Sequence, residues 1–166
     1  MGVVENCIEE LKKQLGESAG EVAPALDEVL TINIKPTAII DALEIMRDHP
    51  NGAFDMLTDL TAIDWLNYPD TGARFEVVYL LSSTTANHRA RIKCRLSETD
   101  PRINSATAVY KTAEWLEREV WDLFGIKFDG HPDLRRIMLY EEFEGHPLRK
   151  DFPKRGYHPV ERTPHT

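Results

Sequence analysis

Residues 117–153 read EREVWDLFGIKFDGHPDLRRIMLYEEFEGHPLRKDFP, and this stretch is the most densely patterned part of the chain. It begins with a charged helical pattern that stops at Gly125, and a short apolar strand at 126–128 follows. A Gly-His-Pro triplet then occurs twice, at 130–132 and 145–147, each time with basic residues after it. Proline disfavours a helical conformation in the residue before it, and glycine permits a tight turn. Each triplet therefore predicts a rigid corner that directs the next basic cluster.

Outward from this stretch, helical and extended patterns alternate. Apolar residues at helical spacing predict four helices, at about residues 3–15, 36–48, 105–110 and 113–124. Apolar or alternating runs predict four more strands, at residues 29–34, 54–66, 74–82 and 89–96. Residues 17–28 predict a loop, and 83–88 a hairpin turn. This order predicts an α+β fold, a two-layer sandwich of helices on one face of a mostly antiparallel or mixed sheet.

The composition changes at about residue 146. Residues 146–166 contain five Lys and Arg against two acidic residues, together with four prolines and few apolar side chains. Such a segment cannot form a core of its own. We therefore expect residues 1–145 to form the α+β domain. Residues 146–166 are expected to form an extended, basic, proline-rich C-terminal arm, either disordered or ordered on a partner surface.

Composition also excludes several classes of protein. A chain of 166 residues and 19.0 kDa is the size of one domain. Its net charge of −8 disfavours general nucleic-acid binding, which requires a basic surface. Two cysteines cannot by themselves hold an iron–sulfur cluster, which normally takes four ligands. The N-terminus lacks the apolar core of a signal peptide, and no run is long enough for a membrane span, so we expect a cytoplasmic chain without an anchor.

The histidines and acids of the patterned stretch admit a chemical interpretation. His131 and His146 could bind a metal ion together with Asp133 and Asp151, which would suit a small metal-dependent hydrolase. Their spacing matches no usual zinc pattern, and both histidines precede proline. Corner histidines that hydrogen-bond to the backbone are therefore the favoured interpretation.

The charges on the last predicted helix also have two interpretations. Glu117, Glu119 and Asp122 could form a carboxylate pair for acid–base chemistry, but Arg118 among them favours ion pairs. Glu114–Arg118 and Arg118–Asp122 have the i, i+4 spacing of such pairs. Three later arginines, Arg135, Arg136 and Arg149, could form a phosphate-binding patch. The acidic character of the rest of the chain instead favours docking to an acidic partner surface or internal ion pairs.

The patterned stretch resembles the 30 kDa subunit of respiratory complex I, the NADH:quinone oxidoreductase. The resemblance rests on Glu117-Arg118-Glu119, Asp122, Gly125-Ile126, Phe128 and the run GHPDLRR at 130–136. The run PLRKDFP at 147–153 and the lead-in residues Pro101, Ile103, Ser105, Ala113 and Trp115 extend it. Together these matches cover about residues 101–153.

The resemblance implies a non-catalytic scaffold and assembly subunit in the peripheral arm of a complex I-like NADH:quinone oxidoreductase of a respiratory chain. It implies that this chain binds no cofactor, and that FMN and iron–sulfur clusters lie on other subunits. The implied partners are the quinone-site subunit, which is similar to a hydrogenase large subunit, and the subunit with the terminal cluster. The implied location is peripheral, on the cytoplasmic side of the inner or plasma membrane, with the membrane contacted only through the complex and no nucleic acid bound.

Similar chains occur in related membrane hydrogenases and in other quinone- or cofactor-linked dehydrogenases, and a free-standing module that binds an acidic protein is a further alternative. In the leading interpretation, the subunit interface uses the charged and corner residues of the motif. These residues are Glu117, Arg118, Asp122, His131, Asp133, Arg135, Arg136, His146, Arg149, Lys150 and Asp151.

Overall fold

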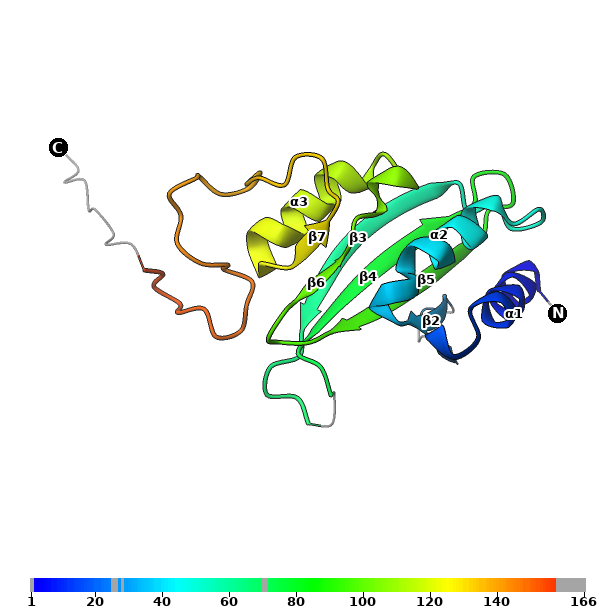
Figure 1. The fold of residues 1–166 in the computed structure, drawn as a ribbon, viewed down its shortest axis with the longest axis horizontal. Helices are drawn as coiled ribbons and strands as arrows, with labels where there is room; N and C mark the ends of the chain where they lie inside the picture. The colour runs from blue at the N-terminus through cyan, green and yellow to red at the C-terminus, as the bar shows by residue number, and fades with distance from the viewer. Residues whose placement is uncertain (1, 25–26, 28, 70–71, 158–166) are drawn as a thin grey trace.

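The computed structural model describes residues 2–24, 27, 29–69 and 72–157 (Figure 1). Its α-helices are α1 (Val3–Leu15), α2 (Ile39–Asp48) and α3 (Ala113–Phe124). Five strands form the main sheet: β1 (Ala19–Pro24), β2 (Leu30–Ile34), β3 (Met56–Asp64), β4 (Phe75–Ser82) and β5 (Arg89–Leu96). Two short strands pair separately, β6 (Arg102–Asn104) and β7 (Lys127–Asp129). Three 3-10 turns complete the described elements: η1 (Gly16–Ser18), η2 (Pro36–Ala38) and η3 (Ala106–Ala108).

The main sheet is mixed, with strand order β1-β2-β5-β4-β3. All neighbours are antiparallel except β2 and β5, which run parallel. Between β2 and β5 the chain passes through α2 and the β3–β4 hairpin, and in Figure 1 α2 lies across the sheet. The expected α+β architecture, with helices on a mostly antiparallel or mixed sheet, is confirmed.

The core lies between the sheet and the helices. Every second residue of β4 points toward the helices and is almost fully buried, namely Phe75, Val77, Tyr79 and Leu81. The helices contribute a matching apolar stripe, with Leu11 of α1 and Leu43 and Met46 of α2 fully buried. Burial of such a continuous apolar surface is the main driving force for this fold. The other face of the sheet carries no helix among the described residues.

Two elements differ from the sequence-based expectation. Residues 17–28 were expected to form a loop, but 19–24 form β1, which pairs with β2 through partners such as Val22 and Ile32. This segment is small and acidic, with no clear alternation, and the neighbouring strand's backbone makes it a strand. The three-residue strand β6 was not predicted, because it is too short to show a period and exists through parallel pairing with β7.

After β7 the described chain forms turns but no helix or strand, and we call residues 130–157 the C-terminal segment. Irregular structure therefore begins earlier than the predicted boundary at residue 146. The first part of the predicted arm lies against the domain, since the N–H of Leu148 donates to the carbonyl of Leu123 in α3 (3.0 Å). Residues 158–166 of that arm lie outside the described residues. None of the helices in the described ranges is both long and apolar enough to cross a membrane.

Candidate functional site

Helix α3 buries three charged residues: Arg118 and Asp122 face the C-terminal segment, and Glu117 faces the domain. Glu117 and Asp122 are completely buried, and Arg118 is nearly so. A buried charge is costly unless it is paired or hydrogen-bonded, so these side chains require partners nearby. The C-terminal segment supplies most of them, because it runs along α3 after leaving β7 (Figure 1).

Asp122 binds the C-terminal segment through both carboxylate oxygens. Its Oδ2 accepts three successive backbone N–H groups, from Ile137 (3.0 Å), Met138 (2.9 Å) and Leu139 (2.9 Å). Its Oδ1 accepts from Nη1 of Arg136 at 2.5 Å. Burial opposes ionisation of Asp122, but these N–H groups and the guanidinium hold its pKa below the usual range. The carboxylate therefore stays charged and fixes the backbone of residues 136–139 on α3.

Arg136 extends this contact further along the segment. Its Nη2 donates to the carbonyl of Phe143 at 2.6 Å, and its guanidinium lies 5.9 Å from the centre of the Trp121 ring. One arginine thus connects α3 to two parts of the segment. The expected ion-pair role of Asp122 is confirmed, but its partner is Arg136 and not Arg118, so the i, i+4 prediction was wrong.

Arg118 is bound by backbone carbonyls. It donates from Nε to the carbonyl of Arg135 (3.2 Å) and from Nη2 to that of Arg136 (3.0 Å). The predicted pair with Glu114 is therefore also wrong, because the carbonyls of the overlying segment occupy the guanidinium. Arg135 itself points outward and pairs with Asp133 at 2.8 Å.

Glu117 lies on the domain side of α3 and joins the helix to η3. Its carboxyl oxygens contact Oγ of Ser105 and the N–H of Ala106, both at 2.6 Å. Burial raises the pKa of Glu117 to about 7, while these two hydrogen bonds act in the opposite direction. The prediction of an ion pair was wrong for this residue, since its partners among the described residues are a hydroxyl and a backbone amide.

Both Gly-His-Pro corners hold their histidine against α3. Nε2 of His131 lies 2.9 Å from the carbonyl of Glu114, and its Nδ1 accepts the N–H of Asp133 (3.0 Å). Nδ1 of His146 lies 2.9 Å from the carbonyl of Asp122, and burial, assisted by the nearby Arg149, lowers the pKa of His146. The expectation that these corner histidines bind backbone is confirmed.

The second corner also closes the C-terminal end of α3. The last carbonyls of a helix have no partner within the helix and carry partial negative charge. Arg149 donates from Nε to the carbonyl of Phe124 (2.5 Å), and its guanidinium lies over the Phe75 ring. Gly125 turns the chain here with φ 73°, and a Cβ at this position would lie 2.5 Å from both Arg149 and His146. Glycine is therefore required for the close approach of the segment.

A charge cluster that the sequence did not predict fixes the end of the segment to the sheet. Arg74, immediately before β4, holds Asp64 of β3 through two hydrogen bonds (3.1 and 2.9 Å) and Asp151 through one (2.7 Å). Oδ2 of Asp64 also accepts the N–H of Lys150 at 2.9 Å. Burial opposes ionisation of Asp64, but Arg74 and the backbone donors keep its pKa low. Asp151 thus pairs with Arg74 and not with an arginine of the motif. No local spacing signalled a contact between residues so far apart in the chain.

The outer surface of α3 and the C-terminal segment is apolar as well as charged. Of the seven large apolar side chains that are exposed in the described part of the chain, five lie here, namely Trp115, Met138, Tyr140, Leu148 and Tyr157. A hollow of about 150 Å³ lies beside Tyr157, lined also by His146, Arg149 and Phe152. Exposed apolar side chains gathered on one surface are typical of a protein–protein contact.

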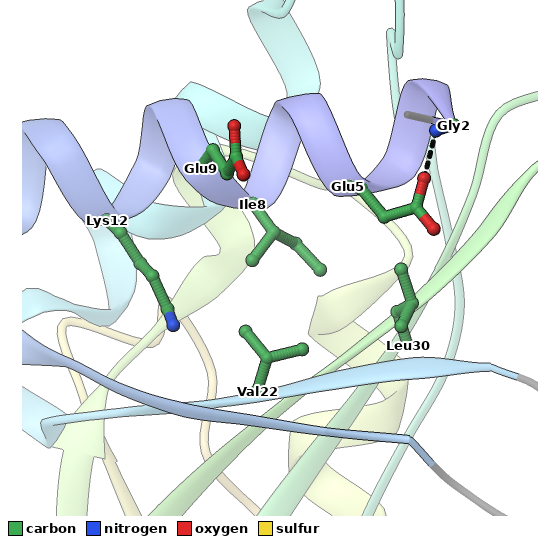
Figure 2. A pocket seen from close by; sticks show the side chains of 7 residues that line it. All are labelled: Gly2, Glu5, Ile8, Glu9, Lys12, Val22 and Leu30. Carbon is green, nitrogen blue, oxygen red and sulfur yellow. Dashed lines mark hydrogen bonds between the residues drawn. The ribbon is translucent and has the colours of Figure 1, made fainter.

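Other parts of the molecule offer less organised features. A cavity of about 510 Å³ opens between α1 and the β1–β2 hairpin, where Ile8, Val22 and Leu30 point toward one another (Figure 2). The charged residues that line it come from α1, and it lies apart from the patterned stretch. Within the described ranges, no three His, Cys, Asp or Glu side chains gather closely enough to hold a metal ion. Cys7 and Cys94 are both buried and free.

Comparison with known proteins identifies the family. Residues 32–158 match the family described as the 30 Kd subunit of the respiratory-chain NADH dehydrogenase. The chain is 50% identical over 124 residues to a subunit of the NADH-quinone oxidoreductase of Rhizobium meliloti, covering 75% of this chain and 66% of that protein. It is 48% identical over 128 residues to NADH-ubiquinone oxidoreductase subunit 9 of Reclinomonas americana, covering 77% of this chain and 61% of that protein. The chain thus spans slightly less than two thirds of these relatives.

A third relative and two solved structures agree with this match. A subunit of the NADH-quinone oxidoreductase of Trichlorobacter lovleyi is 50% identical over 125 residues, covering 75% of each chain. The trypsin-resistant fragment (1–134) of Nqo5 superposes with a TM-score of 0.64 at 30% identity, over 79% of this chain and 98% of that one. A chain of an archaeal membrane-bound sulfane sulfur reductase has the same fold, with a TM-score of 0.74 at 24% identity over 99% and 97% of the two chains. With the match spanning residues 32–158, the chain belongs to the family of the 30 kDa subunit of the respiratory-chain NADH dehydrogenase.

Proposed function

We propose that this chain is a non-catalytic scaffold and assembly subunit in the peripheral arm of a complex I-like NADH:quinone oxidoreductase. The observation that carries the proposal is the family match over residues 32–158, which contains the whole patterned stretch of α3 and the C-terminal segment. Relatives at 48–50% identity are named as subunits of NADH-quinone or NADH-ubiquinone oxidoreductases. In this proposal the chain supports electron transfer from NADH to quinone by holding other subunits in place.

The docking surface of this proposal is the outer side of α3 and the C-terminal segment. The hydrogen bonds of Asp122, Arg118 and Arg149 fix the backbone of this segment on α3. The outward side chains of the segment are therefore already positioned before a partner binds. Contacts that are preorganised in this way lose less conformational entropy on binding. Exposed Trp115, Met138 and Leu148 provide apolar anchors, and exposed Arg135 and Lys150 provide charge at the rim.

The inward-facing members of the predicted interface have a different role in this proposal. Asp122, Arg136 and Arg149 shape the surface from beneath, because their charged groups are bound within the chain. They position the segment, and the exposed residues touch the partner.

We further propose that the partners are the quinone-site subunit and the subunit with the terminal iron–sulfur cluster. FMN and the clusters then lie on other subunits, and the chain is peripheral on the cytoplasmic side of the membrane.

A second candidate is the equivalent subunit of a related membrane-bound complex with another electron donor. The fold is compatible with this candidate, since a chain of a membrane-bound sulfane sulfur reductase shares it. The higher identity to the NADH-quinone oxidoreductase subunits favours the first proposal.

Paired variants of one methionine test the docking surface in the native host. Met138 is 62% exposed, so Met138→Asp places a charge on the surface, whereas Met138→Leu keeps it apolar. With a tagged chain, we expect Met138→Asp to reduce the recovery of partner subunits at least tenfold and Met138→Leu to leave it within twofold. Equal recovery with both variants, at unchanged melting temperature, would show that this surface is not the interface.

A further inference from the structure

The sheet face opposite the helices carries a row of basic side chains. On β5, which lies in the middle of the sheet (Figure 1), the alternate residues that point to this face are Arg89, Arg91, Lys93 and Arg95. Their neighbours on the same strand are buried against the helices. Alternate residues of a strand are about 7 Å apart, so the row is straight and about 20 Å long. A row of four cations is unexpected in a chain with a net charge of −8.

Internal acids neutralise only part of this row. Glu76, opposite Arg95 on β4, is buried and pairs with both Lys93 (3.0 Å) and Arg95. Arg91 pairs with the half-exposed Asp27 at 2.5 Å. Arg89 is exposed and forms no ion pair with any residue that the structure describes. The row therefore presents more positive than negative charge to the solvent.

Two donors at one end of the row lack acceptors. The Arg95 guanidinium lies 4.8 Å from the centre of the Trp65 ring. In the described part of the chain, Nη1 of Arg95 and Nε1 of Trp65 are buried without a hydrogen-bond partner. Buried N–H groups almost always find an acceptor, so these two donors are suited to one that arrives from outside, although Oε1 of the buried Glu76 opposite Arg95 also lacks a hydrogen-bond partner among the described residues.

The face around the row is hollowed at both ends. At one end, a hollow of about 270 Å³ is lined by Arg89, by Arg91 with its partner Asp27, and by apolar side chains such as Leu80. At the other end, a hollow of about 250 Å³ is lined by two basic residues, Arg95 and Lys35, and one acidic residue, Glu17, among others. Between them the β4 side chains Val78 and Leu80 form an apolar floor. The face therefore offers a basic line, an apolar floor and two places for side chains.

We propose that this sheet face binds an acidic, extended segment of a partner protein, separately from the C-terminal segment. The alternate side chains of an extended segment repeat every 7 Å or so, which matches the row of cations, and carboxylates suit the forked guanidinium donors. A nucleic acid or an anionic membrane attracts a broad basic field, whereas this row is narrow and belongs to an acidic chain. The occupant that fits is thus a protein segment with Asp or Glu at alternate positions.

The test uses the free full-length chain and a defined acidic probe, a fluorescently labelled poly-L-glutamate of about 20 residues. Fluorescence anisotropy at low and physiological ionic strength gives the affinity. We expect the wild-type chain to bind, and Arg89→Glu/Arg91→Glu to bind at least tenfold more weakly. The control Lys111→Glu/Lys127→Glu makes the same change in net charge at two exposed lysines near α3, and we expect its affinity to remain within about threefold of wild type. If the charge-reversal pair lowers the melting temperature, the double variant Arg89→Ala/Arg91→Ala replaces it in the same titration.

Three results would overturn the proposal. The first is the absence of binding by the wild-type chain at low ionic strength, and the second is an equal loss in the β5 and control variants, which would reflect net charge alone. The third is tighter binding of phosphatidylglycerol vesicles than of the peptide, which would identify a membrane surface. Because the titration needs no other subunit, its failure leaves the proposed subunit role intact. Failure of the subunit role would likewise leave this binding unaffected.

Discussion

Removal of the Asp122 carboxylate should release the C-terminal segment while the domain stays folded. In the wild-type chain this completely buried group accepts three backbone N–H groups and one guanidinium. Asp122→Ala leaves Arg136, whose side chain is only 15% exposed, without its carboxylate. Breaking a buried charge pair by removing one partner costs about 3–5 kcal/mol. Residues 137–139 are partly exposed, so the segment can recover hydrogen bonds to water by opening. We therefore expect the open population to rise about 100- to 4,000-fold.

Limited trypsin digestion measures this opening, because cleavage after Arg136 requires the segment to leave α3. When opening and closing are fast compared with cleavage, the rate is proportional to the open population. The control is Asp133→Ala, which removes a carboxylate from the same segment but from an exposed pair with Arg135, and should change the rate less than about fivefold. A cleavage rate for Asp122→Ala within threefold of wild type would refute the claim that the Asp122 carboxylate holds the C-terminal segment on α3. Unfolding of the whole domain would show instead that Asp122 supports the core.

Three further predictions concern the same region. First, the pKa of Glu117 is about 7 in the folded chain and about 4.5 in the unfolded chain. Between pH 4.5 and 7 the folded chain therefore binds a proton that the unfolded chain releases. The free energy of unfolding should fall by about 3 kcal/mol as pH rises through this range. Glu117→Gln should remove this component, and melting curves of both chains between pH 5 and 8 measure the difference. Second, Arg149→Ala should destabilise the contact between the segment and α3 by about 1.5–3 kcal/mol, because the last carbonyls of the helix lose a charged donor. The rate of tryptic cleavage after Arg136 and the melting temperature measure this loss. An unchanged cleavage rate would contradict the capping role of Arg149. Third, Gly125→Ala should be more harmful than Gly130→Ala in thermal melts. Both glycines have positive φ, but only at Gly125 would a Cβ meet the segment, so equal effects would exclude the close-approach argument.

The strands and helix ends were predictable where the pattern is local. β5 alternates along its whole length, β4 is a nearly continuous apolar run, and Gly125 ends α3 at the expected position with a left-handed conformation. β1 and β6 were missed because pairing with a neighbouring strand, and not their own composition, makes them strands. A sequence pattern reports which face of a segment is apolar, but it does not report which backbone lies beside it.

The candidate site was found from its motif, but its internal geometry was not. The corner histidines bind backbone as expected, whereas Arg118 and Glu117 have partners that no spacing rule indicates. The pair of Asp64 and Arg74 was missed for the same reason, since it joins adjacent strands to a segment that arrives much later in the chain. The interface role of the motif residues remains a prediction, and the structure suggests which of them position the segment and which face outward.

Affinity purification of the chain from its native membranes tests the central claim most directly. The co-purifying proteins are identified by mass spectrometry, and the sample is assayed for NADH oxidation coupled to quinone reduction. The account predicts recovery of a quinone-site subunit and a cluster-bearing subunit, together with NADH-dependent activity. Recovery of the chain as a lone protein, under conditions that keep the respiratory complex intact, would contradict it.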